Sequence, residues 1–130
     1  MRELKRQFVS KGVEYTQLYK DDEMVIYQAK ANHYGVNDIY YEVFNYRVSS
    51  MNPMSTDYDP EEKVEVYPRD KAFGYWAWCC SDWKCVAKVL RNHYDYNDET
   101  IRNLAKHNPK LEPLMSVLDV CEETLNFNYY

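Results

Sequence analysis

Hydrophobic and polar residues alternate through the first half of the chain with the period of two that is typical of β-strands. Residues 13–20 and 24–30 are two such runs, and the acidic segment 21–23 between them predicts a turn that joins them as a hairpin. Residues 39–48 form the strongest strand pattern, with hydrophobic or aromatic side chains at both odd and even positions. A strand with two such faces is expected to be central in a sheet and covered on both sides.

Two segments beside these strands predict other structures. Leu4 and Phe8 lie four residues apart and Gly12 follows them, a spacing that predicts a short helix over residues 2–9. Residues 31–38 contain a glycine and two asparagines, and they are predicted to form a loop between strands.

After residue 48 the alternation is interrupted by residues 49–62, which contain two prolines and several acidic residues. This segment is too long for a tight turn and is predicted to be an excursion from the sheet. Residues 63–67 alternate again and predict an edge strand or one arm of the excursion. Residues 73–80 predict a further, buried strand. One of its faces would carry Phe73, Tyr75, Ala77 and Cys79, and the other Trp76, Trp78 and Cys80.

The pattern changes to a helical period after residue 80. Ser81 is predicted to cap a helix that ends near His93, and Asn97 to cap a second helix. A last helix is predicted over residues 112–125, with Pro113 in its first turn. The hydrophobic stripes of these helices are Trp83, Val86, Ala87 and Leu90, then Ile101, Leu104 and Ala105, then Leu114, Met115, Leu118, Cys121 and Leu125.

A run of strands followed by a run of helices is typical of an α+β fold. We therefore predict an antiparallel sheet of four to five strands with helices on one face. At 130 residues the chain is predicted to be a single domain. Residues 1–92 would form its β-rich core with one helix, and residues 93–130 a helical extension.

The tyrosine content adds to this picture of the sheet. The chain has 14 Tyr beside 4 Phe and 3 Trp, and aromatic residues make up 16% of it. So many rings exclude a disordered chain. A domain of this size offers too few partners to bury every tyrosine hydroxyl. Some tyrosines are therefore expected on the surface, where such rings are favoured in binding interfaces.

Charge is unevenly distributed along the chain. The formal net charge is −5, which argues against generic DNA binding. Residues 1–12 carry four bases and one acid, whereas residues 57–65 carry five acids and one base, and residues 111–130 four acids and no base. No apolar run approaches the ~20 residues of a membrane span, and the N-terminus does not resemble a secretory signal. We expect a cytoplasmic protein that does not bind membranes.

The excursion is the main candidate for a partner-binding site, because binding residues concentrate on loops that a rigid scaffold holds. The predicted contacts are Asp57, Tyr58, Asp59, Glu61 and Glu62. An ordinary mobile, solvated loop is the alternative. The acids also resemble a calcium-binding loop faintly, but the turn glycine is missing and Pro68 stands where an acid is required. No metal is therefore expected.

Nothing in the sequence predicts catalysis. It has no phosphate-binding glycine loop, no nucleophile elbow and no paired zinc-binding cysteines, and its three histidines share no ligand spacing. Cys79, Cys80, Cys85 and Cys121 are predicted to be reduced, and at least one of the first two to lie in the core. We expect a non-enzymatic protein without a cofactor.

Residues 41–48 (YEVFNYRV) and 66–78 (VYPRDKAFGYWAW) are followed by the helix predicted at 83–90. Together they resemble a group of small proteins encoded by phages and mobile elements, whose pattern is YEVxxxR, then YPxxxx(F/W)GxxxW, then a short amphipathic helix. The resemblance covers residues 10–92 and implies a mobile-element origin and a shared fold rather than an activity. The excursion is acidic here, where a more basic segment is expected of the group.

Surface rings, acidic patches and this resemblance predict a non-enzymatic phage accessory protein that binds a host protein. In its most specific form, the hypothesis is an inhibitor of a bacterial defence system, similar to anti-CRISPR proteins. Such an inhibitor would present its acidic groups to a nucleic-acid-binding surface.

The alternative hypothesis is a protein that binds or sequesters nucleotides or single-stranded nucleic acid, because bases stack on aromatic faces. The predicted stacking rings are Tyr40, Tyr46, Trp76 and Trp78, with Arg47, Arg69 and Lys71 as nearby cations. A third hypothesis is a homo-oligomer formed through the last helix, whose hydrophobic face Val117 and Val120 would widen.

Overall fold

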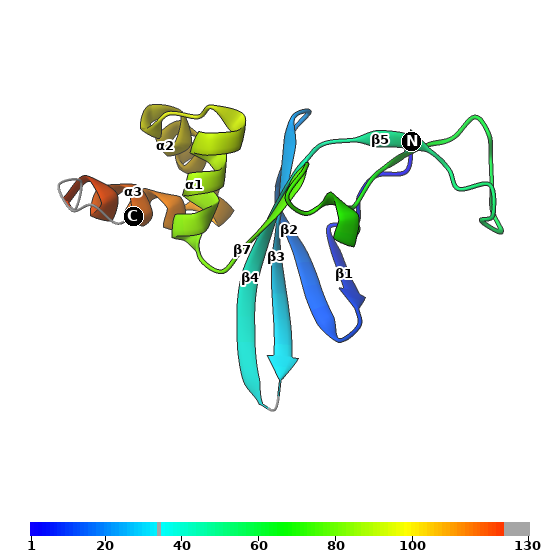
Figure 1. The fold of residues 1–130 in the computed structure, drawn as a ribbon, viewed down its shortest axis with the longest axis horizontal. Coiled ribbons are helices and arrows are strands. Elements are labelled where there is room, and N and C mark those ends of the chain that lie inside the picture. Colours follow the sequence, from blue (N-terminus) through cyan, green and yellow to red (C-terminus); the bar gives the residue numbers. More distant parts are fainter. Residues whose placement is uncertain (34, 124–130) are drawn as a thin grey trace.

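The computed structural model describes residues 1–33 and 35–123 and has the predicted α+β architecture (Figure 1). A five-stranded antiparallel sheet has the order β1-β2-β3-β4-β7, and its strands are Gln7–Ser10, Val13–Lys20, Met24–His33, Val36–Asn45 and Ala77–Cys80. A two-stranded sheet pairs β5 (Val48–Ser50) with β6 (Lys63–Glu65). The helices are α1 (Trp83–Tyr94), α2 (Asp98–His107) and α3 (Pro113–Glu123), with short 3₁₀ turns η1 (Asp70–Ala72) and η2 (Pro109–Leu111).

The predicted helix over residues 2–9 is wrong, because β1 occupies Gln7–Ser10 and pairs with β2. Lys11 and Gly12 join the two strands with φ values of 52° and 78°, the left-handed pair that a two-residue hairpin turn requires. The Phe8 ring lies parallel to the ring of its cross-strand neighbour Tyr15, with centroids 4.7 Å apart. A spacing of four residues places two side chains on the same face of a strand as well as of a helix. Here the contact between Phe8 and Tyr15 favours the strand.

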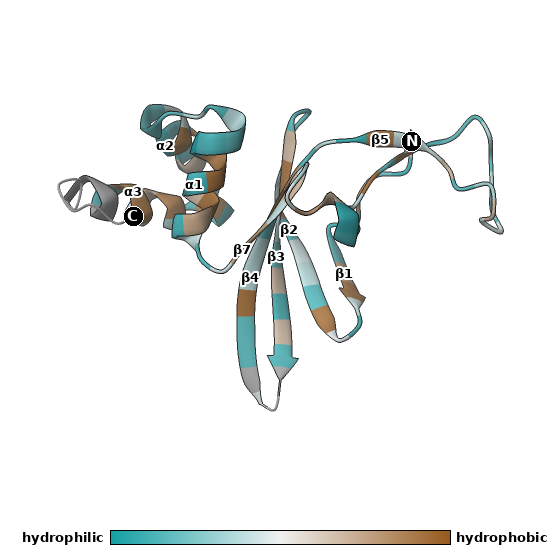
Figure 2. Cartoon of the chain, viewed as in Figure 1, coloured by the Kyte–Doolittle hydropathy of each residue, from teal (hydrophilic) through white to brown (hydrophobic). Residues whose placement is uncertain are grey.

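The predicted loop at residues 31–38 is wrong in extent. β3 continues to His33 and β4 begins at Val36, and their pairing is unbroken from Met24↔Asn45 to His33↔Val36. A continuous ladder of backbone hydrogen bonds thus carries the strands through positions whose residue types favour loops. In Figure 2 the end of this hairpin that points away from the helices is mostly hydrophilic.

One face of the sheet packs against the helices, as predicted. Met24, Ile26 and Val43 are fully buried there, and the helices contribute buried residues from their predicted stripes. Those buried helical residues are Val86, Ala87, Leu90, Ile101, Ala105, Leu114 and Leu118, and Val89, which the predicted stripe did not include, is buried with them. The side chains of residues 120–125, and with them the predicted contacts of Cys121 and Leu125, lie outside the described part.

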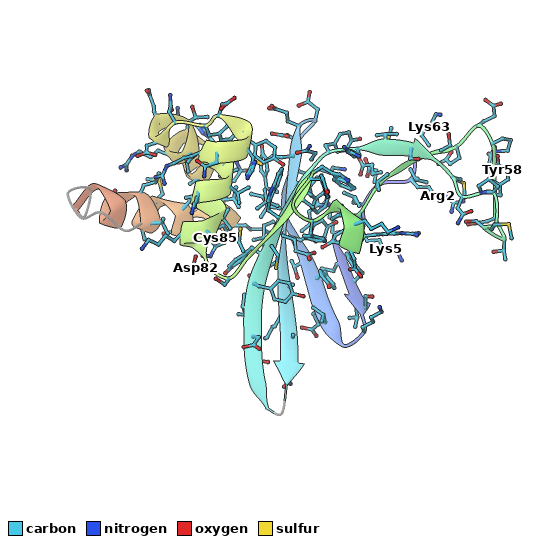
Figure 3. All side chains as sticks on the ribbon, in the orientation of Figure 1. Arg2, Lys5, Tyr58, Lys63, Asp82 and Cys85 are labelled. Atoms are coloured by element: carbon cyan, nitrogen blue, oxygen red, sulfur yellow. The ribbon has the colours of Figure 1, made fainter. Side chains whose placement is uncertain are left out.

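The helix starts agree with the sequence analysis in two of three cases. Asn97 caps α2, its side chain accepting a hydrogen bond from the Thr100 amide at 2.8 Å, and α3 begins at Pro113. For α1 the predicted cap, Ser81, is wrong. Asp82 is the cap, and its carboxylate accepts from the Cys85 amide at 2.8 Å (Figure 3).

The opposite face, which we call the aromatic face, is covered without helices. Val25, Tyr27, Phe44 and Ala77 are fully buried on it. Their cover comes from the N-terminal segment and from the segment that leads into β7. The rings that pack here are Phe8, Tyr15, Tyr46, Tyr67, Phe73 and Trp76. The expectation that residues 39–48 belong to a strand covered on both sides is confirmed for β4.

The strand predicted over residues 73–80 begins only at Ala77. Gly74 adopts a φ of 93°, and its amide donates to the Ala77 carbonyl at 2.8 Å, so the chain turns before the strand starts. The predicted alternation is therefore broken. Ala77 lies on the aromatic face, Trp78 and Cys80 lie toward the helices, and Tyr75 is 83% exposed in the turn.

The predicted excursion is confirmed, and residues 63–67 contribute one side of it rather than an edge of the main sheet. We call residues 48–65 the arm: β5 and β6 pair at its base, and residues 51–62 form its outer loop. The N-terminal segment continues this small sheet through a parallel bridge between Arg2 and Val64. Of the helices described, none has the length and apolar character needed to cross a membrane.

Candidate functional site

The arm extends away from the main sheet, on the side opposite the helices (Figure 1). Its outer loop exposes apolar surface, with Met54 at 87% and Tyr58 at 42% exposure. Tyr58 lies toward its outer end, whereas Arg2 and Lys63 lie nearer its base (Figure 3). The arm therefore offers an exposed aromatic residue at a distance from the body of the protein.

The outer loop is held by its own hydrogen bonds. Backbone amides of Ser55, Tyr58 and Glu62 donate to carbonyls three residues earlier, at 3.0, 3.2 and 3.1 Å. The side chains of Asn52 and Asp59 each accept from the amide two residues later, at 2.9 Å. These local bonds order the loop, and an ordered loop would lose less entropy in any binding event than a mobile one.

The four predicted acids of the arm divide into two pairs. Asp57 accepts a hydrogen bond from the Arg2 guanidinium at 2.7 Å, and Glu62 lies 3.2 Å from the amino group of Met1. The hydrogen bond from Arg2 lowers the pKa of Asp57. Asp59 and Glu61 are exposed and have no basic partner among the described residues. The arm thus presents Tyr58, Asp59 and Glu61, while the basic N-terminus neutralises the other two acids.

Glu65 fastens the base of the arm to the body. Its side chain is only 3% exposed and accepts from the Lys20 ammonium at 2.9 Å and from the Leu4 amide at 2.8 Å. The Tyr46 hydroxyl lies near the same carboxylate and donates to the Met1 sulfur at 3.7 Å. Burial raises the pKa of Glu65, but the polar groups of Lys20, Tyr46 and Leu4 outweigh it and hold that pKa below its usual value. The sequence analysis did not single out this residue, whose partners lie up to 61 positions away.

The four predicted stacking rings do not form one surface. Tyr46 and Trp76 pack on the aromatic face, where the Arg47 guanidinium lies 4.4 Å from the centre of the Trp76 ring. Burial and the neighbouring Tyr15 raise the pKa of Tyr40. Trp78 lies on the helical side, with its ring stacked on His93 at 4.1 Å. They could not hold one ligand together, and stacking by any one of them stays a prediction.

A buried carboxyl lies beneath the aromatic face. Glu42 is 8% exposed, and the Tyr67 hydroxyl donates a hydrogen bond to it. Burial raises the pKa of Glu42, and the bond from Tyr67 opposes this shift without cancelling it. Burial and the neighbouring Glu42 charge likewise raise the pKa of Tyr67. The pair has a structural role, because the hydrogen bond gives each of the two buried polar groups a partner in place of water.

Because the folded-state pKa of Glu42 is raised, its contribution to stability is fully present below the unfolded pKa, about 4.3, and is lost as pH rises through the folded value. In Glu42→Gln the amide oxygen still accepts from Tyr67, but the group no longer ionises. We expect the stability of Glu42→Gln relative to wild type to increase from pH 4 to pH 8 in urea unfolding. Other titrating groups are common to both proteins, so a difference that does not change with pH would contradict the assignment.

The described thiols are not paired in disulfides. Cys79, Cys80 and Cys85 are free, and Cys80 is fully buried in the helical core, as predicted for at least one of the first two. Burial, and a hydrogen bond with Cys85, raise the pKa of Cys80, which disfavours a nucleophilic thiolate. Among the side chains that the structure describes, no three of His, Cys, Asp or Glu gather as metal ligands.

Of the two valines predicted to widen the face for a homo-oligomer, the structure describes the side chain of only one. Val117 is half-buried and packs against the helical core, and the side chain of Val120 lies outside the described part. Oligomer formation stays a prediction.

Comparison of the chain with protein-family models, with curated proteins and with solved structures found no match in any of the three. The resemblance to proteins of phages and mobile elements therefore stays a prediction, and the functional argument depends on the geometry of the chain itself.

Proposed function

We propose that this chain is a non-enzymatic binding protein whose arm engages a basic surface of another protein. The observation that carries the proposal is the arm itself, an ordered loop that extends from the body. It presents Tyr58 beside Asp59 and Glu61, two acids that have no basic partner in the part of the chain that the structure describes. Met51 is buried, and side-chain hydrogen bonds hold the turns of the loop. These features distinguish the arm from a structureless loop of the same length.

We call Tyr58, Asp59 and Glu61 the tip of the arm. These side chains are suited to bind lysine and arginine. A guanidinium stacks on a tyrosine ring and forms paired hydrogen bonds with a carboxylate. Met54, the most exposed large hydrophobic residue described, would add an adaptable apolar contact next to these groups. Attraction between the acidic tip and a basic surface would also speed their encounter.

The partner class follows from this charge. A protein that binds nucleic acid carries basic groups arranged for phosphates, and closely spaced carboxylates can occupy them. Together with the resemblance described above, this favours a host defence protein that handles nucleic acid as the partner, with the chain acting as its inhibitor in the host cytoplasm.

The test compares two variants of equal net charge. Asp59→Asn/Glu61→Gln removes the charges of the tip, and Glu14→Gln/Glu112→Gln removes two exposed acids elsewhere as the matched control. Each immobilised protein is exposed to host lysate, and the retained proteins are purified and titrated at 50 and 300 mM salt. We expect the tip variant to bind the same partner about tenfold more weakly, or about 1.4 kcal/mol, with a smaller salt dependence.

The control variant should bind like wild type. Retention of no protein by the wild-type chain, or equal affinity of the tip variant and the control, would overturn the proposal.

A further inference from the structure

An open groove of about 740 Å³ lies on the aromatic face, between the β1–β2 hairpin and residues 67–71. Ligand sites for small molecules commonly span roughly 300–1,000 Å³, so the groove has room for a ligand of that size. It is formed by segments far apart in sequence, and it is separate from the tip of the arm. Its lining combines aromatic and cationic residues.

Three rings line one part of the groove. Phe8 and Tyr15 lie parallel across the β1–β2 pair, and both are half-buried, so part of each ring faces the groove. Tyr67 stands edge-on to them, with centroid distances of 5.3 Å to Phe8 and 5.8 Å to Tyr15. These edge-to-face contacts, with the hydrogen bond from Tyr67 to Glu42, hold the aromatic lining in a fixed shape.

Three exposed cations line the rest. They are Lys11 in the hairpin turn and Arg69 and Lys71 in the opposite wall, with Asp70 as the one acid of the lining. Among the described residues none of the three cations forms an ion pair. The groove is therefore net positive on a chain whose formal charge is −5. An unpaired cationic cluster beside half-buried rings is suited to a ligand that is both anionic and aromatic.

We propose that this groove binds a nucleoside phosphate. The base would lie against the Phe8 and Tyr15 rings, and the phosphates would be held by Arg69 together with Lys11 and Lys71. A longer nucleic acid is disfavoured by the formal net charge of −5. The site is distinct from the arm and does not depend on the function proposed for it. It also differs from the four rings that the sequence analysis selected.

The test measures binding of defined probes by isothermal titration calorimetry at low and physiological salt. The probes are ATP, GTP, CTP and UTP, inorganic triphosphate, and a ten-nucleotide DNA strand. We expect at least one nucleotide to bind with a Kd below about 1 mM, more tightly than triphosphate and at least as tightly, per site, as the DNA strand. Triphosphate binding as tight as that of every nucleotide, or binding of the strand alone, would overturn the proposal.

Variants locate the site. Arg69→Gln/Lys71→Gln should weaken nucleotide binding at least tenfold, while Lys106→Gln/Lys110→Gln, which removes two exposed cations of α2 and η2, should leave it within twofold of wild type. Lys11→Asn, which suits the left-handed turn, should weaken binding less than the double groove variant. Phe8→Leu should weaken nucleotide binding without changing triphosphate binding.

All substituted positions except Phe8 are exposed, so these variants should fold, and circular dichroism checks that they do. Equal nucleotide affinity of the groove and control variants, or no nucleotide binding by the wild-type protein, refutes the assignment.

Discussion

Replacing Tyr67 with alanine is expected to lower the free energy of unfolding by about 3–5 kcal/mol. The Tyr67 ring contacts four others on the aromatic face, with centroid distances of 5.0 Å to Phe44, 5.1 Å to Tyr27, 5.3 Å to Phe8 and 5.8 Å to Tyr15. Its removal leaves a cavity among rings that cannot move together to fill it, and it leaves the buried Glu42 without its donor. Equilibrium urea unfolding measures the loss.

A second substitution separates the two contributions. Tyr67→Phe keeps the ring and removes only the hydroxyl, so its cost is expected to be about 1–3 kcal/mol, the penalty of an unsatisfied buried polar group. Tyr75→Ala is the matched control, because its ring is 83% exposed in a turn. It should change stability by less than about 0.5 kcal/mol. A Tyr67→Ala protein within about 1 kcal/mol of wild type would contradict the central place of this ring.

Glu65→Ala is the second substitution with a large expected effect, again about 3–5 kcal/mol. It leaves the Lys20 ammonium, whose side chain is 23% exposed, without its closest carboxylate, and it removes the acceptor for the Leu4 amide. The contacts of Glu65 with Lys20 of β2 and with the Leu4 amide, which link β6 to β2 and to the N-terminal segment, are then lost. Urea unfolding at pH 7 gives the size of the effect.

The pH dependence of this effect has a definite sign. The folded-state pKa of Glu65 is lowered, so its contribution is present above the unfolded pKa and is lost as pH falls through the folded value. The difference between wild type and Glu65→Ala should therefore shrink in acid. Asp57→Asn, which breaks an exposed ion pair of the same arm, is the control and should leave the unfolding midpoint nearly unchanged. A difference that grows in acid would contradict the role of Glu65.

The fold class followed from the sequence because period-two segments come first and period-3.6 segments later. The errors arose where two periods or two propensities compete. Leu4 and Phe8 fit a helix or a strand equally well, and only pairing with Tyr15 decides between them. The asparagines of residues 31–38 suggested a loop, but a ten-residue ladder overrides them.

The candidate site was harder to predict, because its parts are brought together by long-range contacts. The acids of the arm were visible in the sequence, but the pairing of Asp57 with Arg2 joins positions 55 residues apart. The groove was not visible as a unit, because its walls come from a hairpin turn near residue 11 and from residues 67–71. Aromatic rings were predicted to contribute to binding. The hydrophobic pattern of one strand, however, does not show which of its rings another segment will cover.

The route of the chain between β4 and β7 has a consequence for loop-closure entropy. The Asn45 amide donates to the Trp76 carbonyl at 2.9 Å, so about 30 residues leave the sheet and return to it at one point. Closing so long a loop costs roughly 2 kcal/mol more than closing a two-residue turn, since the cost grows only with the logarithm of length. This is less than the effect expected for Tyr67 or Glu65 alone. The contacts of the inserted segment, which covers the aromatic face, therefore contribute more to stability than the closure of the loop costs.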